Sequence, residues 1–142
     1  MAGLDQTYTG RCRYPADLVS YSQTLFVAVR CWIADLSYPV YALLGTGSQW
    51  CVLPPNLARD LEYTLPAEGP VRLHTRFGSL QGSLERINIR LGADDGLPLD
   101  LDATCYVSPE WPGPFVLGWK GALERIRFAL DPPHERFYFA GP

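Results

Sequence analysis

The chain has 142 residues, enough for one domain with a hydrophobic core and too few for two ordinary domains. Its 47% hydrophobic and 19% charged residues are typical of a globular protein, and 12 basic against 15 acidic side chains give a net charge of −3. Because no cluster of Lys and Arg provides an electrostatic footprint for polyanions, we predict no nucleic-acid partner and no membrane partner.

Two stretches bear on the compartment. The N-terminal "MAGLDQTYTGRCRYPADL" has no basic run followed by an apolar block, so it does not resemble a signal peptide, and we expect a cytoplasmic protein. Residues 36–58 contain no charged side chain, which raises the question of a membrane span. Their prolines, glycines and polar residues favour a buried segment instead.

Cysteine and histidine spacing argues against a metal site. The six candidate ligands are Cys12, Cys31, Cys51, Cys105, His74 and His134. No C-x-x-C pair occurs, and the histidines are isolated from each other and from the cysteines. We therefore predict reduced thiols packed as small hydrophobic side chains, with no metal and no cofactor.

Strand-like segments dominate the chain. In chain order they are Thr24 to Asp35, Tyr38 to Leu44, Leu84 to Leu91, Leu99 to Val107, and a terminal hairpin from Arg127 to Phe139. The clearest pattern is the alternation of apolar and polar residues from Arg86 to Leu91, which is typical of a half-buried strand.

Helix is scarce. Pro54 to Glu62 begins with proline and places Leu57 and Leu61 four residues apart, and Trp119 to Arg127 places Leu123 and Ile126 on one face. The sequence thus predicts a single, mainly β domain over residues 1–142 with one or two short helices.

A glycine loop interrupts the first strands in "YALLGTGSQWCVLPP", Tyr41 to Pro55. A dinucleotide-binding loop would need a third glycine and a helix directly behind it, whereas position 50 is Trp and a strand-like segment follows. A phosphate-binding P-loop would need Gly-Lys-Ser/Thr, which is absent. A plain turn between buried strands explains the glycines but not the Thr and Ser beside them.

A third interpretation rests on a resemblance. "ALLGTGSQWCVL" resembles the catalytic loop of retropepsin-like aspartic peptidases, and "FVLGWKGALERIRFALDP" resembles their second motif of two aliphatic residues and a glycine. The resemblance covers about residues 25–139 and implies a retropepsin-like half-barrel. Enzymes of this family hydrolyse peptide bonds with a water held between two carboxylates that share a proton. A chain with one such motif would need a homodimer with the site on its two-fold axis.

The resemblance also assigns roles one position at a time. Thr46 matches the threonine that hydrogen-bonds across the dimer, Gly47 the glycine that lets substrate approach the backbone, and Ser48 the small residue beside the outer carboxylate oxygen. The two aliphatic residues and the glycine of the supporting segment beneath the loop correspond to Val116, Leu117 and Gly118.

Gly45 stands where the family has its catalytic aspartate. Without a carboxylate there is no acid or base to activate water, so we predict that the chain as written does not hydrolyse peptides. Two explanations remain open. Either this copy of an enzyme was inactivated at position 45, or the protein is a natural pseudo-peptidase that binds a peptide or protein partner. Asp35, Asp100 and Asp102 are not in a matching loop.

A flap hairpin is implied between the two motifs, from Val71 to Ile87, with its turn at Phe77, Gly78 and Ser79. In the family such a hairpin covers an extended peptide. An ordinary surface hairpin explains the segment equally well. The residues expected to contact a peptide or protein substrate are His74, Arg76, Phe77, Gly78 and Ser79. Ser48-Gln49 and Gly118-Trp119 lack the charged pair found near the dimer interface of viral members, so Trp50, Trp111 and Trp119 are candidates for apolar packing there or in the core.

Overall fold

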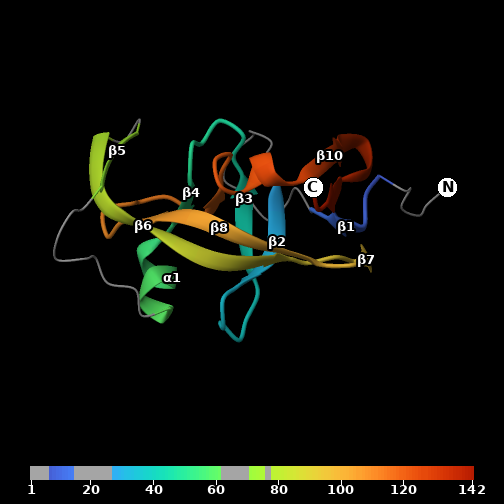
Figure 1. Cartoon of the computed structure of the whole chain (residues 1–142), viewed down its shortest axis with the longest axis horizontal. Coiled ribbons are helices and arrows are strands. Elements are labelled where there is room, and N and C mark those ends of the chain that lie inside the picture. The colour runs from blue at the N-terminus through green and yellow to red at the C-terminus, as the bar shows by residue number, and fades with distance from the viewer. Residues whose placement is uncertain (1–6, 15–26, 62–70, 76–77) are drawn as a thin grey trace.

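The computed structural model describes residues 7–14, 27–61, 71–75 and 78–142 (Figure 1). Its described residues are mainly β. The strands are β1 (Gly10–Arg13), β2 (Ala28–Ile33), β3 (Val40–Leu44), β4 (Cys51–Leu53), β5 (Val71–Thr75), β6 (Gly78–Leu91), β7 (Asp95–Gly96), β8 (Leu99–Val107), β9 (Val116–Leu117), β10 (Arg127–Asp131) and β11 (Arg136–Ala140). The helical elements are α1 (Pro55–Asp60) and the 3-10 turns η2 (Leu123–Arg125) and η3 (Pro132–His134).

The larger sheet closes on itself. Its strands lie in the order β2-β3-β9-β4-β8-β6-β5, and a further pairing of β2 with β6 closes all of them except β5 into a barrel. The closing register pairs Cys31 with Leu91 and Ile33 with Ile89. The barrel therefore has no free edge at this seam, and β5 extends from β6 as one arm of a hairpin.

Alternation along the strands builds the barrel core. On β6 the side chains of Ile87, Ile89 and Leu91 are at most 1% exposed, whereas Asn88 and Arg90 between them are exposed. This confirms the predicted period-two strand, which is the C-terminal part of a longer strand that begins at Gly78 and does not alternate strictly between Gly82 and Glu85. The buried face packs against Cys31, Ile33 and other inward side chains of the barrel.

A second sheet of four strands, in the order β10-β11-β1-β7, carries both chain ends of the described structure. Phe137 and Phe139 of β11 are fully buried, with their rings 5.6 Å apart. Gly10 of β1 is in register with Phe139, and a Cβ at Gly10 would lie 2.3 Å from that ring. The close approach therefore requires glycine. The terminal hairpin was predicted, but β1 and β7 were not.

The first predicted helix is confirmed, and the second is shorter than predicted. Within Pro54 to Glu62 the structure has α1, with Leu57 buried. Within Trp119 to Arg127 it has only η2, because Gly121 adopts a φ of 80°, which interrupts an α-helix. Leu123 and Ile126 are nevertheless buried. No helix in the described part of the chain is long and apolar enough to cross a membrane.

Candidate functional site

The glycine loop rests on β9, a strand of two residues. β9 lies between β3, to which it is parallel, and β4, to which it is antiparallel. Where β3 ends, the Gly45 N–H donates to the Leu117 carbonyl over 2.9 Å. The Ser48 N–H donates back to the Gly45 carbonyl over 3.0 Å and closes a tight turn around Thr46 and Gly47. The structure thus brings the two sequence motifs into direct contact.

The second motif passes so close to the backbone of Trp50 and Cys51 that only glycine fits at position 118. A Cβ on Gly118 would lie 2.1 Å from the carbonyl oxygen of Trp50. The Gly118 N–H donates to Sγ of Cys51 over 3.3 Å. Beyond it, the N–H groups of Trp119 and Lys120 donate to the carbonyls of Ser48 and Gln49 over 2.8 and 2.7 Å. The loop is therefore bound to the second motif on both sides.

Exposure differs along the loop. Thr46 and Gly47 are exposed, and a Cβ added to Gly47 would have no atom of the described residues within 4 Å. The Ser48 hydroxyl donates to the Trp50 carbonyl over 2.7 Å, which fixes the chain as it leaves the turn. Thr46 and Gly47 thus form the accessible tip of a loop whose two ends are pinned.

No carboxylate stands at Gly45, and the three aspartates considered above do not supply one. Asp35 is in the turn between β2 and β3, at the end of that hairpin away from Gly45. Asp100 and Asp102 pair with Arg90 and Arg86 on the outer wall of the barrel, at 2.8 and 2.7 Å. The space that an aspartate Cβ would need at Gly45 is 2.7 Å from Cγ1 of Val116.

The predicted flap is a regular antiparallel hairpin of β5 and β6, with Thr75 opposite Gly78. His74 and Ser79 are both exposed, and His74 Nδ1 lies 2.9 Å from Ser79 Oγ. Gly78 has a φ of 105°, which favours glycine. Arg76 and Phe77 lie outside the described residues. In Figure 1 the end of β5 and the β3–β4 loop are at the same, upper, end of the molecule.

Comparison with solved structures identifies the architecture. The crystal structure described as a retropepsin-like aspartic protease from Rickettsia conorii superimposes with a TM-score of 0.60, over 91% of this chain and 98% of that chain, at 14% sequence identity. The chain has a retropepsin-like fold. No protein-family model matches the sequence, and no curated protein matches it either.

Buried thiols lie beneath the loop of this retropepsin-like barrel. Cys51 on β4 is in register with Cys105 on β8, and all four cysteines are buried and free. The Cys105 thiol and the Gly118 N–H donate hydrogen bonds to the Cys51 sulfur, and these bonds lower the pKa of Cys51. The pKa of Cys105 is raised, because its thiol donates this hydrogen bond to Cys51 and because it is buried. In the described part of the chain no cluster of three or more His, Cys, Asp or Glu residues is placed to hold a metal ion.

Aromatic side chains flank the retropepsin-like loop. The Trp50 ring lies 5.2 Å from Nζ of Lys120, a cation–π contact. Trp119 is 44% exposed and packs edge-on against Phe128 at 6.3 Å. Lys120 and Cys51 were missed by the sequence reasoning, because their contacts to the loop run through a backbone N–H, a sulfur and a ring face, none of which has a sequence signature.

Proposed function

We propose that the chain forms a retropepsin-type peptide-binding site at the two-fold axis of a homodimer. Its ligand is an extended peptide or protein segment, of the kind that aspartic endopeptidases cleave. As written, the chain does not cleave it, because Gly45 provides neither the acid nor the base that would activate water.

The contact between the two motifs carries this proposal. The loop from Gly45 to Ser48 is supported from below through the Leu117 carbonyl, and the Gly118 position admits only glycine. A plain surface turn needs no such support. The empty space over Gly47 is also significant, since neither a positive φ nor a neighbouring atom requires glycine there. Close approach by a ligand or a second chain would account for it.

The homodimer follows from the chemistry of the family, because each chain contributes one loop and a carboxylate pair needs two. Thr46 is exposed at the loop tip and so is accessible to a second chain. Light scattering over a range of concentrations tests this directly. A particle that remains monomeric at high concentration, with and without peptide, would contradict the two-fold site.

Restoring the carboxylate tests the catalytic part. Gly45→Asp should cleave denatured protein at mildly acidic pH, whereas Gly45→Asn should not, since Asn has nearly the same shape and cannot exchange the proton. Cleavage is measured by mass spectrometry of the products. Because Val116 Cγ1 occupies part of the required space, each variant is also made with Val116→Ala. If the Gly45→Asp, Val116→Ala double variant folds and dimerises but leaves every substrate intact, the proposal that this loop can support peptide hydrolysis is refuted.

The packing at Gly45 favours a second candidate function, a natural pseudo-peptidase. Val116 sits against the bare Cα of Gly45, which suits a site adapted to glycine. In that case the unaltered chain binds extended peptides without cleavage. Gly47→Leu is the matched probe, because its side chain meets nothing within the protein near Cβ and would project into the space above the loop. It should abolish peptide binding without loss of stability. Equal binding by Gly47→Leu and the unaltered chain would refute a peptide site over this loop.

A further inference from the structure

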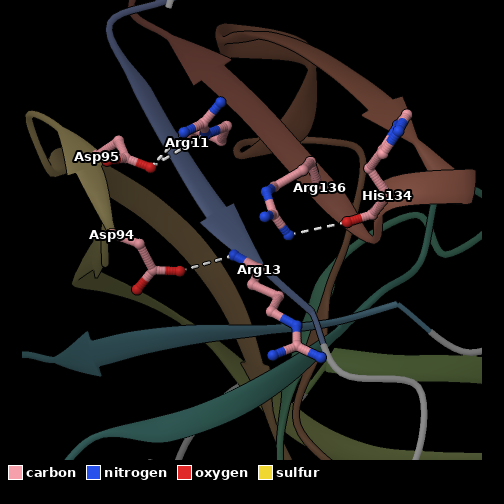
Figure 2. Close-up of polar contacts among 6 residues, drawn as sticks. All are labelled: Arg11, Arg13, Asp94, Asp95, His134 and Arg136. Carbon is pink, nitrogen blue, oxygen red and sulfur yellow. Dashed lines mark hydrogen bonds and ion pairs between the residues drawn. The ribbon is translucent and has the colours of Figure 1, made fainter. Parts of the chain in front are cut away.

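Two arginines face each other on the second sheet, away from the glycine loop. β1 and β11 are antiparallel with Arg13 opposite Arg136, so both side chains leave the same face of the sheet. Figure 2 shows the two side chains on adjacent strands, with Arg11, Asp94 and Asp95 beside them. On the other side of Arg136, β10 places Asp131 in register with it.

Directly opposed like charges destabilise a strand pair. The barrel wall shows the usual alternative, because Arg90 is opposite Asp100 and binds it with two hydrogen bonds of 2.8 and 3.1 Å. The Arg13–Arg136 pair therefore works against folding unless a negative group compensates it.

The neighbouring carboxylates of the described residues compensate these two charges only in part. Arg136 donates from Nη1 to the His134 carbonyl over 2.8 Å, and no carboxylate of the described residues lies within 4.0 Å of its guanidinium. Asp131, its cross-strand neighbour, instead contacts Nδ1 of His134 at 2.9 Å. Nε of Arg13 is 3.9 Å from Glu135 Oε2, beyond hydrogen-bond reach, and the Arg13 side chain is 64% exposed. Among the described residues, most N–H donors of both guanidinium groups have no acceptor.

Two adjoining hollows lie at these arginines. The larger, about 280 Å³, is lined by Arg13, Pro133, His134, Glu135 and Arg136. The smaller, about 140 Å³, is lined partly by Asp94 and Asp95. Both of these carboxylates already accept hydrogen bonds. Asp94 accepts from the backbone N–H of Arg13 and from the Arg30 guanidinium, and Asp95 accepts from the Arg11 guanidinium. An anion is therefore favoured in the larger hollow, where Glu135 is the one carboxylate among the described lining residues.

The geometry points to a binding site for a phosphate group in the larger hollow, held by the guanidinium groups of Arg13 and Arg136. Planar guanidinium groups present parallel N–H donors that match the oxygens of phosphate. A bound phosphate would also neutralise the opposed charges. The Glu135 carboxylate competes for Arg13, so it limits the affinity of the site.

The test uses the full chain titrated with inorganic phosphate, followed by calorimetry and by thermal unfolding, against potassium chloride at equal ionic strength. Phosphate should bind saturably and raise the unfolding temperature. Arg13→Gln and Arg136→Gln should each weaken binding about tenfold or more, while being at least as stable as the unaltered chain without phosphate, because each removes one of the two opposed charges. Glu135→Gln should bind more tightly. Arg86→Gln, the same charge change on the barrel wall, should leave the affinity unchanged.

Two further ligands define the class. Glycerol 3-phosphate should bind at least as well as inorganic phosphate if the group recognised belongs to a phosphomonoester, and more weakly if free phosphate is the ligand. Acetate should bind much more weakly than either. The site is refuted if phosphate gives no saturable response beyond chloride, if acetate binds as tightly, or if Arg86→Gln weakens binding as much as Arg13→Gln. Weaker binding by Glu135→Gln would also refute it, and this gain-of-affinity variant does not depend on the folding of the arginine variants.

Discussion

Three glycines around the loop should respond to alanine in a fixed order. A methyl group at Gly47 would meet no atom within 4 Å in the part of the chain that the structure describes. At Gly45 it would lie 2.7 Å from Val116 Cγ1 and 3.4 Å from Ser48 Cβ. At Gly118 it would lie 2.1 and 2.3 Å from backbone atoms of Trp50. The added methyl group therefore meets open space at Gly47, a side chain at Gly45 and the backbone at Gly118.

The expected free energies of unfolding follow from these contacts. Gly47→Ala should be neutral or stabilising by about 0.4–1 kcal/mol, because alanine reduces the entropy of the unfolded chain. Gly45→Ala has the same gain but overpacks Val116 at a cost of about 1–3 kcal/mol, so its net effect should lie between neutral and a destabilisation of about 2.6 kcal/mol. Gly118→Ala should cost more than about 4 kcal/mol, because β4 and β9 must separate.

Urea unfolding followed by the fluorescence of the four tryptophans measures the series. Val116→Ala is added to Gly45→Ala to complete a double-mutant cycle, and the pair should be coupled by about 1 kcal/mol in the favourable direction. If Gly118→Ala were as stable as Gly47→Ala, the close contact between Gly118 and the Trp50 backbone would not be what supports the loop. Additive effects of Gly45→Ala and Val116→Ala would show that Val116 does not limit the space at Gly45.

Two other predictions concern the core. Burial raises the pKa of Cys12 and of Cys31 from 9.0 to about 12, so the stability they contribute is fully present below about pH 9 and is lost as the pH rises toward 12. The free energy of unfolding should fall by about 1.4 kcal/mol per pH unit for each thiol in that window. Urea titrations across it should show a shallower fall for Cys31→Val, and an equal fall would contradict the assignment. The buried Tyr106 hydroxyl donates to the Leu80 carbonyl over 2.9 Å. Tyr106→Phe should therefore lower the free energy of unfolding by about 1–3 kcal/mol. Tyr41→Phe on the surface should lower it by about 0.5 kcal/mol or less. Equal costs for these two variants would show that the buried hydrogen bond contributes nothing.

The strands in which apolar and polar residues alternate were predictable from sequence, because the alternation shows which face of the strand is buried. This holds for β6, whose Ile87 and Ile89 are buried beside exposed Asn88. β1 was missed because its four residues include two arginines, and β7 because it has only two residues. Closure of the barrel through β2 and β6 was not predictable, since the register pairs residues that are far apart in sequence.

The candidate site divides along similar lines. The pairing of the two glycine motifs was readable from the resemblance, and the structure places them in hydrogen-bond contact. The short extent of the helix predicted within Trp119 to Arg127 has a local cause, the left-handed Gly121, which a periodicity argument does not detect. The steric role of Val116 against Gly45 was also out of reach, because it depends on packing across two strands rather than on spacing along one.

The position of β9 constrains the order in which this protein can be completed during synthesis. β3 and β4 are translated before the strand that lies between them, which is β9, Val116–Leu117, and follows β5, β6, β7 and β8 in the chain. Until that segment leaves the ribosome, the facing edges of β3 and β4 lack their partner. Unpaired strand edges readily associate with other chains. The nascent protein is therefore exposed to association through these edges from the time β4 emerges until β9 does, and the candidate site cannot form before then.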